Sequence, residues 1–213
     1  DLAAVLRLHR ERKARATIVL TPVDNPTAYG LVETDKDGNI KRFLEKPKPE
    51  EITTHNINAG IYVLEPDTFD RIPSNVSWSI ERSYFPSLVE RGETFVAYVY
   101  NGYWIDIGTP EKYMQVHRDI MDGRFKADPF TNLAAPRIWM GDEARIEEGA
   151  AVEGPCFIDE GSLVKAGARV GPYSVLGKQC QVEEGARVDG AIVWQNGRIG
   201  RDAEIAGALL GRN

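Results

Sequence analysis

The chain has 213 residues, of which 42% are hydrophobic, and a formal net charge of −6 at pH 7. This hydrophobic content supports packed cores and excludes global disorder. The negative charge and the absence of a basic stripe exclude nucleic acid as an expected partner. No apolar run approaches the length of a membrane-spanning helix, so no membrane partner is expected either.

The first 123 residues predict an α/β layer in which strands and helices alternate. The chain begins at Asp1 inside an amphipathic helical pattern and has no initiator methionine, so we expect a fragment of a longer protein. Residues 35–39, with Gly38, are typical of a hairpin tip. Strands are predicted at residues 17–20, 31–33, 40–44, 57–64 and 94–100, and short helices at residues 66–72 and 79–91.

Residues 101–110 combine a turn signal with a helix start. Asn101-Gly102 predicts a two-residue hairpin turn, with a second strand over residues 103–108. Thr109-Pro110 predicts a helix that begins with a hydroxyl cap and a proline. Asp106 on the predicted strand has two interpretations: an acid that caps the helix or lies at the edge of the core, or a ligand for a hard cation at the carboxyl end of a strand.

After residue 123 a period of six residues dominates the sequence. Such a period over this length predicts a hexapeptide β-helix, in which each aliphatic side chain fills the inside of a coil. A small residue follows four positions later and fits the corner, and glycines 149, 161, 167 and 185 mark turns. After Val188 the phase slips by one residue. The aliphatic positions are Ile146, Val152, Ile158, Val164, Val170, Leu176, Val182, Val188, Ile199 and Ile205.

The sequence therefore predicts a catalytic-type α/β segment over residues 1–123, a linker over residues 124–137 and a repeat domain over residues 138–213. Cys156 and Cys180 both fall on the small corner position of the repeat. We expect them to be buried and reduced, which favours the cytoplasm. The repeat domain is expected to serve oligomerisation, as in a homo-oligomer, or regulation.

Five motifs carry a resemblance to a known family. The chain resembles the C-terminal two-thirds of a sugar-1-phosphate nucleotidyltransferase with a left-handed parallel β-helix tail, and mannose-1-phosphate guanylyltransferases are the nearest match. The resemblance implies the C-terminal part of a Rossmann-like domain followed by the β-helix. The motifs are Tyr29-Gly30, Phe43-Leu44-Glu45-Lys46-Pro47, Asn58-Ala59-Gly60-Ile61-Tyr62, Ser79-Ile80-Glu81 with Phe85-Pro86, and Tyr103-Trp104-Ile105-Asp106-Ile107-Gly108-Thr109-Pro110.

The resemblance implies that a sugar-1-phosphate oxygen attacks the α-phosphorus of a nucleoside triphosphate and that pyrophosphate leaves. Such a reaction needs charge neutralisation and in-line positioning more than covalent catalysis. Mg²⁺ is the implied cofactor, with Asp106 as one ligand. The family's glycine-rich phosphate loop and the Gly-Asp that would share the metal have no counterpart in this sequence. We therefore expect the chain to be inactive alone.

Lys46 and Glu45 are the implied contacts to the sugar phosphate and to the sugar hydroxyls. A compact ammonium suits a phosphate, and a carboxylate accepts hydrogen bonds from hydroxyls. The alternative for Lys46 is a solvated lysine at a hairpin end. The alternative for Glu45 is a surface ion pair with Lys46 or Lys41.

Asn58, Gly30 and Tyr29 complete the implied substrate-binding set. Asn58 offers a donor and an acceptor, and its alternative is a turn residue at a strand edge. Gly30 would let the backbone come close to the sugar, and its alternative is a plain turn glycine. Trp104 is expected to pack rather than to bind.

Three other functions are alternatives to this interpretation. Glucose-1-phosphate thymidylyl- or uridylyltransferase remains open, because the residues that would recognise the base lie largely outside this sequence. A non-catalytic regulatory paralogue would be favoured by loss of Glu45, Lys46 or Asp106, and all three are present. A hexapeptide acyltransferase generally uses a histidine in or beside its coils, and residues 138–213 contain none.

Overall fold

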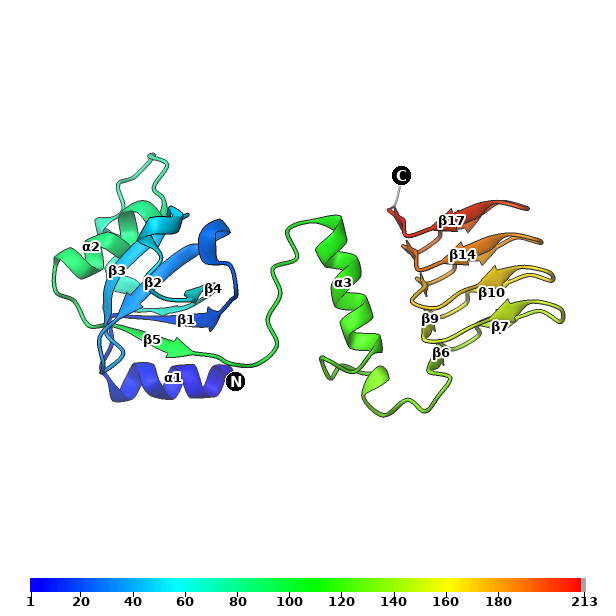
Figure 1. Cartoon of the computed structure of the whole chain (residues 1–213), viewed down its shortest axis with the longest axis horizontal. Helices are drawn as coiled ribbons and strands as arrows, with labels where there is room; N and C mark the ends of the chain where they lie inside the picture. The colour runs from blue at the N-terminus through cyan, green and yellow to red at the C-terminus, as the bar shows by residue number, and fades with distance from the viewer. Residues whose placement is uncertain (212–213) are drawn as a thin grey trace. The chain divides into compact units, whose positions relative to one another are not determined.

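The computed structural model describes residues 1–211, which form two compact units (Figure 1). The first is Asp1–Trp104 and the second is Ile105–Asn213. The last two residues of the predicted repeat domain, 212 and 213, lie outside the described residues. None of the helices within residues 1–211 is both long and apolar enough to cross a membrane.

The first unit is built on a mixed five-stranded sheet in the order β3-β2-β4-β1-β5. Only the β1–β5 pair is parallel, and the others are antiparallel. The sheet curls until its two edges meet, because Asn39 at the β2–β3 tip bridges to Val96 of β5. The strands are β1 (Ala16–Pro22), β2 (Gly30–Thr34), β3 (Ile40–Glu45), β4 (Asn56–Leu64) and β5 (Phe95–Val99).

Short helices surround this sheet. α1 begins after Asp1, whose carboxylate accepts a hydrogen bond from the Ala3 N–H at 2.9 Å. The predicted helix over 79–91 is a π-helical turn that continues as α2. The widened turn suits Pro86, because proline clashes with the carbonyl four residues earlier in a regular α-helix. The helices are α1 (Leu2–Glu11), η1 (Pro26–Ala28), η2 (Pro49–Glu51), η3 (Pro66–Arg71), η4 (Ile80–Tyr84) and α2 (Phe85–Glu90).

An aromatic core lies between the sheet and α2. Phe85 is fully buried, and its ring centroid lies 5.1–5.3 Å from those of Phe43, Tyr62 and Phe95. Each such aromatic pair contributes about 0.5–1.5 kcal/mol beyond its burial. Because Phe43 and Tyr62 belong to motifs that carry candidate site residues, this core also fixes the strands that hold the site.

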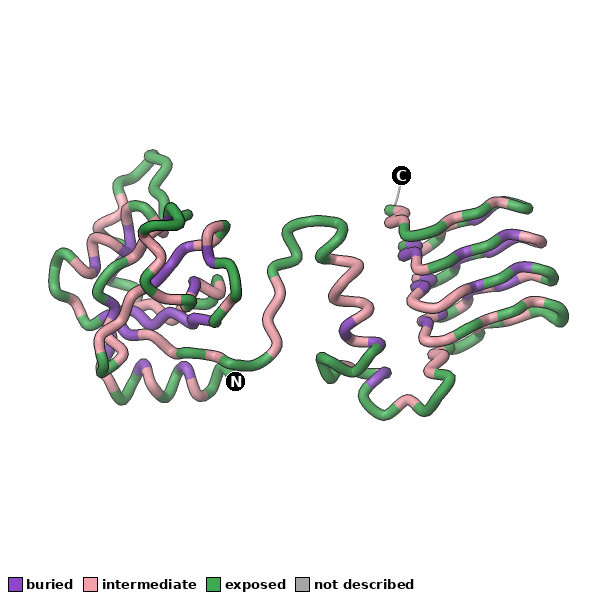
Figure 2. The backbone as a smooth tube through the Cα atoms, viewed as in Figure 1, coloured by how far each residue is buried: buried purple, intermediate pink, exposed green. Residues whose placement is uncertain are grey.

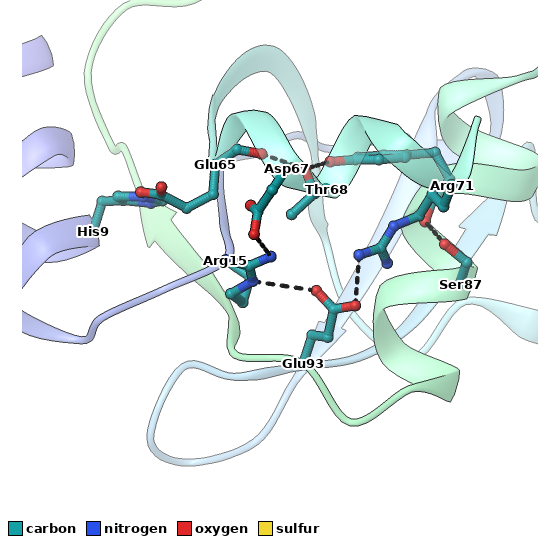
Figure 3. A network of polar contacts seen from close by, with 9 residues as sticks. His9, Arg15, Glu65, Asp67, Thr68, Arg71, Ser87 and Glu93 are labelled. Carbon is teal, nitrogen blue, oxygen red and sulfur yellow. Dashed lines mark hydrogen bonds and ion pairs between the residues drawn. The ribbon is translucent and has the colours of Figure 1, made fainter.

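A polar network ties α1, β1 and η3 together and includes Glu93, which precedes β5 (Figure 3). His9 is buried, and its Nδ1 and Nε2 lie 2.8 Å from Thr17 Oγ1 and 3.0 Å from Glu65 Oε1. Elsewhere in the network, the Arg71 guanidinium pairs with the Glu93 carboxylate at 2.6 Å. Buried charges need such partners, so this network selects one packing of the three elements.

The predicted hairpin at residues 101–102 is wrong. β5 ends at Val99, and residues 100–108 form no strand. A two-residue hairpin turn needs positive φ, and neither Asn101 nor Gly102 has it. A Cβ at Gly102 would lie 2.2 Å from Tyr100 Oη, so glycine lets the Tyr100 side chain lie against this segment. Side-chain packing of Trp104, described below, takes the place of strand pairing.

The second unit is a parallel β-solenoid of three sheets, together with one helix (Figure 1). The helical elements are α3 (Pro110–Met121), which begins after the predicted Thr109 cap, and η5 (Phe130–Asn132). The strands are β6 (Ile138–Met140), β7 (Arg145–Ile146), β8 (Ala151–Val152), β9 (Cys156–Ile158), β10 (Leu163–Val164), β11 (Arg169–Val170), β12 (Val175–Leu176), β13 (Gln181–Val182), β14 (Arg187–Asp189), β15 (Ile192–Val193), β16 (Arg198–Ile199), β17 (Glu204–Ala206) and β18 (Leu209–Leu210).

The period of six is confirmed by the register of the solenoid. Val164 pairs with Val182, one coil of 18 residues later, whereas Leu176 pairs with Val193 after only 17. The phase slip after Val188 is therefore a coil shortened by one residue. The aliphatic and small positions from Cys156 onward form one buried core, visible as recurring buried segments in Figure 2. The four predicted turn glycines all have positive φ.

The two cysteines lie in this core and are unpaired, as predicted. Burial raises the pKa of Cys156 to about 11 and also raises the pKa of Cys180. Both thiols are therefore protonated at neutral pH and behave as small apolar corner residues.

One outer face of the solenoid is apolar and is covered by α3. Its outward residues on the sheet β18-β15-β12-β9-β6 include Trp139, Phe157, Val175 and Ile192, and they pack against Met121. Burial of this face places α3 in the second compact unit, whereas the predicted segment boundary lies after the helix, at residue 123. The sequence motifs place the boundary after α3, at residue 123, whereas the packing of α3 on the solenoid places it before the helix, after Trp104.

Candidate functional site

Four of the predicted site residues lie on the paired ends of β2 and β3. Gly30 is the register partner of Glu45, and the Lys46 N–H donates to the Tyr29 carbonyl at 3.1 Å. The backbone pairing therefore brings the Tyr29-Gly30 motif beside Glu45 and Lys46, as the resemblance implies for a common site.

Gly30 begins a strand and has no positive φ, so the alternative of a plain turn glycine is wrong. A Cβ at this position would lie 2.8 Å from Phe43 Cζ and 3.1 Å from Glu45 Oε2. Glycine therefore leaves the space in which the Glu45 carboxylate and the Phe43 ring lie.

Lys46 has a left-handed backbone with φ of 50°. This conformation is uncommon for a residue with a side chain and costs on the order of 1 kcal/mol or more. It ends β3 sharply just before Pro47. The Lys46 side chain is exposed, and within residues 1–211 its ammonium forms no ion pair or hydrogen bond, so it is free to meet an anion.

Glu45 is held in an unfavourable environment. Its Oε2 is buried and has no hydrogen-bond partner within residues 1–211. Burial raises the pKa of Glu45, and the nearby Glu81 carboxylate raises it further, while Lys46 and Arg82 act in the opposite direction. The surface ion pair proposed as an alternative is absent from the described residues, and Lys41 pairs with Asp35 instead.

Asn58 is fully engaged as a donor. Its Oδ1 accepts from the Gly60 N–H at 2.9 Å, and its Nδ2 donates to Tyr62 Oη at 2.8 Å and to Glu81 Oε1 at 3.2 Å. Only the second lone pair of Oδ1 remains for a ligand.

A bulge in β4 makes this arrangement possible. Ile18 pairs with Tyr62 and Leu20 pairs with Asn58, so β4 spans four residues where β1 spans two. Gly60 in the bulge has φ of 79°. Bulges commonly redirect side chains beside functional sites, and this one brings Asn58 and Tyr62 into contact.

Glu81 and Tyr62 received no role from the sequence. Both stand in motifs that carry the resemblance, and the contacts to Asn58 are what single them out. Asn58 and Tyr62 are an even number of positions apart on one strand, which was a usable signal for a shared face.

Trp104 packs, as expected. Its ring meets the Tyr29 ring edge-on with centroids 5.6 Å apart, and its Nε1–H donates to the Ala59 carbonyl at 3.2 Å. Tyr29 and the β4 bulge are thereby joined through one indole.

Asp106 lies in the second unit, in an irregular segment, so its predicted position at a strand end is wrong. It is exposed, and it is not the cap of α3, because Thr109 Oγ1 accepts from the Lys112 N–H. Its carboxylate suits a hard cation as a single ligand. No group of three or more His, Cys, Asp or Glu side chains within residues 1–211 is arranged to hold a metal.

Comparison with known proteins relates both parts of the chain to one kind of enzyme. The nucleotidyl transferase family matches residues 1–123, the extent of the predicted catalytic segment, and the family described as the GMPPB C-terminal domain matches residues 152–213.

Individual relatives agree. The chain is 38% identical to a mannose-1-phosphate guanylyltransferase of Mycobacterium tuberculosis, over 81% of this chain and 46% of the relative. It is 32% identical to a UTP–glucose-1-phosphate uridylyltransferase of Synechocystis, over 99% of this chain and 55% of the relative. It is 35% identical to a probable mannose-1-phosphate guanylyltransferase 1 of Oryza sativa subsp. japonica, over 80% of this chain and 42% of the relative.

The chain thus spans about half the length of the curated relatives that it matches. Members of this family generally use a divalent metal. The family match covers more than half of the chain and carries all the site motifs of the first unit, and the solenoid follows it in the order that the motifs imply. The chain belongs to the nucleotidyl transferase family.

Proposed function

We propose that this chain is the sugar-binding part of an enzyme that transfers a nucleotidyl group from a nucleoside triphosphate to a sugar-1-phosphate. The preferred substrates are GTP and mannose-1-phosphate, and the products are GDP-mannose and pyrophosphate. The observation that carries this proposal is the buried, unpartnered Glu45 Oε2, which lies next in sequence to the free Lys46 ammonium. A hydroxyl acceptor and a cation on adjacent residues match the two ends of a sugar phosphate.

Each residue has a distinct task in this proposal. Lys46 holds the phosphate of the sugar while its oxygen attacks the α-phosphorus, because an ammonium neutralises charge without fixing one oxygen. Glu45 accepts a hydrogen bond from a sugar hydroxyl, which satisfies its buried oxygen. Asn58 Oδ1 offers a further acceptor, and Tyr29 and Gly30 form the wall beside them.

Asp106 is the proposed ligand for Mg²⁺ in this chain. The ion would neutralise charge on the reacting phosphates, and a carboxylate is a ligand type that it prefers. Since one carboxylate does not make a site, the phosphates of the substrates would supply further ligands.

The triphosphate side of the reaction has no counterpart in residues 1–123. A glycine-rich loop between a strand and a helix binds phosphates through backbone N–H groups, and no such loop occurs there. We therefore expect the 213 residues alone to be inactive. The unpaired buried cysteines support a reducing compartment, the cytoplasm, and we assign the solenoid to homo-oligomer formation.

A second candidate is uridylyl transfer to glucose-1-phosphate. The Synechocystis relative supports it, because its match extends over 99% of this chain. The pairing of GTP with mannose-1-phosphate is preferred because relatives with higher identity, 38% and 35%, are named mannose-1-phosphate guanylyltransferases.

The test is a pyrophosphate-release assay on the protein at its full natural length and on the 213 residues alone. GTP, UTP and dTTP are each combined with mannose-1-phosphate and glucose-1-phosphate. We expect the highest kcat/KM for GTP with mannose-1-phosphate, and no turnover by the 213 residues. Preference for UTP and glucose-1-phosphate would select the second candidate. A folded full-length protein without turnover would indicate a regulatory paralogue.

A matched lysine pair tests the site itself. Lys46→Met should raise the KM for the sugar-1-phosphate and lower kcat, because it removes the phosphate contact. Lys48→Met changes an exposed lysine two residues away and should leave both constants unchanged. Equal effects of the two variants would contradict the role of Lys46.

A further inference from the structure

Glu81 is an acid that the sequence left without a role and that the structure places in the candidate site. It is the second residue of η4 (Ile80–Tyr84), a turn fixed by the Ser79 cap, whose Oγ accepts from the Arg82 N–H at 3.1 Å. η4 is in contact with β3, the strand that ends at Glu45, and the Glu81 carboxylate raises the pKa of Glu45, second only to burial. Two carboxylates therefore stand together at one end of β3.

Glu81 is held in place by Asn58. One Glu81 oxygen, Oε1, accepts from Asn58 Nδ2 at 3.2 Å, and the amide itself is oriented by Gly60 and Tyr62. Because Gly60 N–H fixes Oδ1 as the acceptor, the amide must turn its NH₂ group toward Glu81. The Glu81 carboxyl group also lies within hydrogen-bonding reach of the Glu45 carboxyl group, and this contact adds to the rise in the pKa of Glu45.

The charged neighbours do not neutralise this pair. Lys46 and Arg82 lower the pKa of Glu45, but neither makes an ion pair with Glu45 or Glu81 among the described residues. Tyr62 lies near both carboxylates. Burial raises the pKa of Tyr62 most, its hydrogen bond with Asn58 lowers the pKa, and the charges of Glu81 and Glu45 raise it. Two ionised carboxylates cannot donate to each other, and Tyr62 Oη–H makes no hydrogen bond to either of them within residues 1–211. A bound ligand with hydroxyl groups would supply donors to both acids.

We infer that Glu81 is a second sugar-recognition residue, and that Glu81 and Glu45 each accept a hydrogen bond from a different hydroxyl of the same bound sugar. This inference rests on the proposed function, because it takes the sugar to bind at Glu45. In it, the chief task of the Asn58 amide is to position Glu81.

The inference explains why the site tolerates two adjacent acids. Neighbouring sugar hydroxyls supply donors at the spacing of two adjacent acceptors, and they remove the repulsion penalty by satisfying both. It also predicts specificity, because a sugar that lacks one of the hydroxyls leaves one of these partly buried carboxylates without its donor. Loss of such a bond is strongly discriminated.

The test uses Glu81→Gln in the protein at its full natural length. The glutamine Oε1 still accepts from Asn58, so the position of the side chain is kept while its charge and second acceptor are lost. KM for mannose-1-phosphate and for each of its monodeoxy analogues is measured with the parent and the variant. Glu90→Gln on α2, an exposed residue that makes no hydrogen bond or ion pair within residues 1–211, is the matched control.

We expect Glu81→Gln to raise KM for mannose-1-phosphate by about 10- to 100-fold, the range for a hydrogen bond to a charged group. KM for the nucleotide should stay unchanged. For one monodeoxy analogue the variant and the parent should have equal KM values, because the bond is already absent. Glu45→Gln should show the same behaviour with a different monodeoxy analogue.

A uniform rise in KM across all analogues would overturn the inference, since a merely structural role affects every sugar alike. A rise in the nucleotide KM would overturn it too. If the parent protein releases no pyrophosphate with any sugar-1-phosphate, the proposed function has failed. If the parent is active and its discrimination is unaffected by Glu81→Gln, only this inference has failed.

Discussion

Substitution of Ala168 by phenylalanine should strongly destabilise the solenoid. Ala168 is fully buried at a coil corner, in the same core as Ala150 and Ala186 one coil before and after it. Neighbouring coils are hydrogen-bonded to each other, because Arg169 N–H donates to the Ala186 carbonyl at 2.8 Å. A phenyl ring at the corner therefore has no space along the coil axis or across it. Overpacking of this kind costs about 1–3 kcal/mol or more.

The adjacent residue provides the control. Arg169 points away from the core and is exposed, so Arg169→Ala should change stability by at most about 0.5 kcal/mol. For a domain of this size a loss of 1–3 kcal/mol corresponds to a decrease in Tm of roughly 4–20 °C. Thermal unfolding followed by circular dichroism measures both variants. Equal decreases in Tm would refute the assignment of inward and outward positions.

Three further predictions concern the metal ligand, the buried ion pair and the acid in the site. In the full-length protein, Asp106→Asn should lower kcat by orders of magnitude without a change in Tm, and near-normal turnover in saturating Mg²⁺ would contradict its role as a ligand. Arg71→Ala should destabilise the protein by about 1–3 kcal/mol in chemical unfolding, because it leaves the partly buried Glu93 carboxylate with only its longer contact to Arg15, at 3.6 Å, and Arg71→Met with Glu93→Leu should recover most of the loss. The folded-state pKa of Glu45 is raised, so its cost to stability is absent at low pH and appears as the pH rises past the ordinary value toward the raised one. Glu45→Gln should therefore gain more in Tm at pH 7 than at pH 4, and an equal gain at both would contradict this.

The solenoid could be predicted from the sequence almost residue by residue. Each coil has 18 residues and three short strands, and each strand contributes one inward aliphatic residue, so the inward position recurs every six residues along the sequence. The coil of 17 residues is also visible in the sequence, as the slip of one residue after Val188. The cover of α3 over one face was not predicted. Its signal is an apolar outward residue once per coil, on every third strand, as at Phe157, Val175 and Ile192. This repeat is three times longer than the six-residue repeat of the inward positions, so the pattern recurs fewer times in the sequence.

The hairpin over residues 101–108 shows where local patterns fail. Alternation and Asn-Gly describe what a segment can do, and strand formation also needs a partner with open hydrogen-bonding groups. Trp104 instead donates to Ala59 and packs on Tyr29, two contacts that are remote in sequence. No window of ten residues contains the information that decides between these outcomes.

The sequence predicts individual contact residues of the candidate site, but not the hydrogen bonds that connect their side chains to one another. Glu45, Lys46, Gly30 and Asn58 came from motifs, and the structure brings them to one region of the first unit. Glu81 also stands in a motif, but the motif gave it no role, because its contact with Asn58 depends on the bulge in β4. A bulge has no reliable sequence signal beyond Gly60 itself.

The site concentrates features that weaken the fold. Glu45 has a buried oxygen without a partner, Glu81 adds a like charge beside it, and Lys46 has a strained backbone. Each costs free energy that the aromatic core around Phe85 must offset. A protein can keep three such features together only if selection acts on something other than stability, and a bound sugar phosphate would satisfy the two acids and pair with the lysine. Sugar-1-phosphate should therefore stabilise the full-length protein against heat, and Glu45→Gln should reduce this stabilisation while it raises the Tm of the unliganded protein. If Glu45→Gln raises the Tm of the unliganded protein but leaves the Tm shift caused by sugar-1-phosphate unchanged, then Glu45 destabilises the fold without binding the sugar, which would contradict the proposed site.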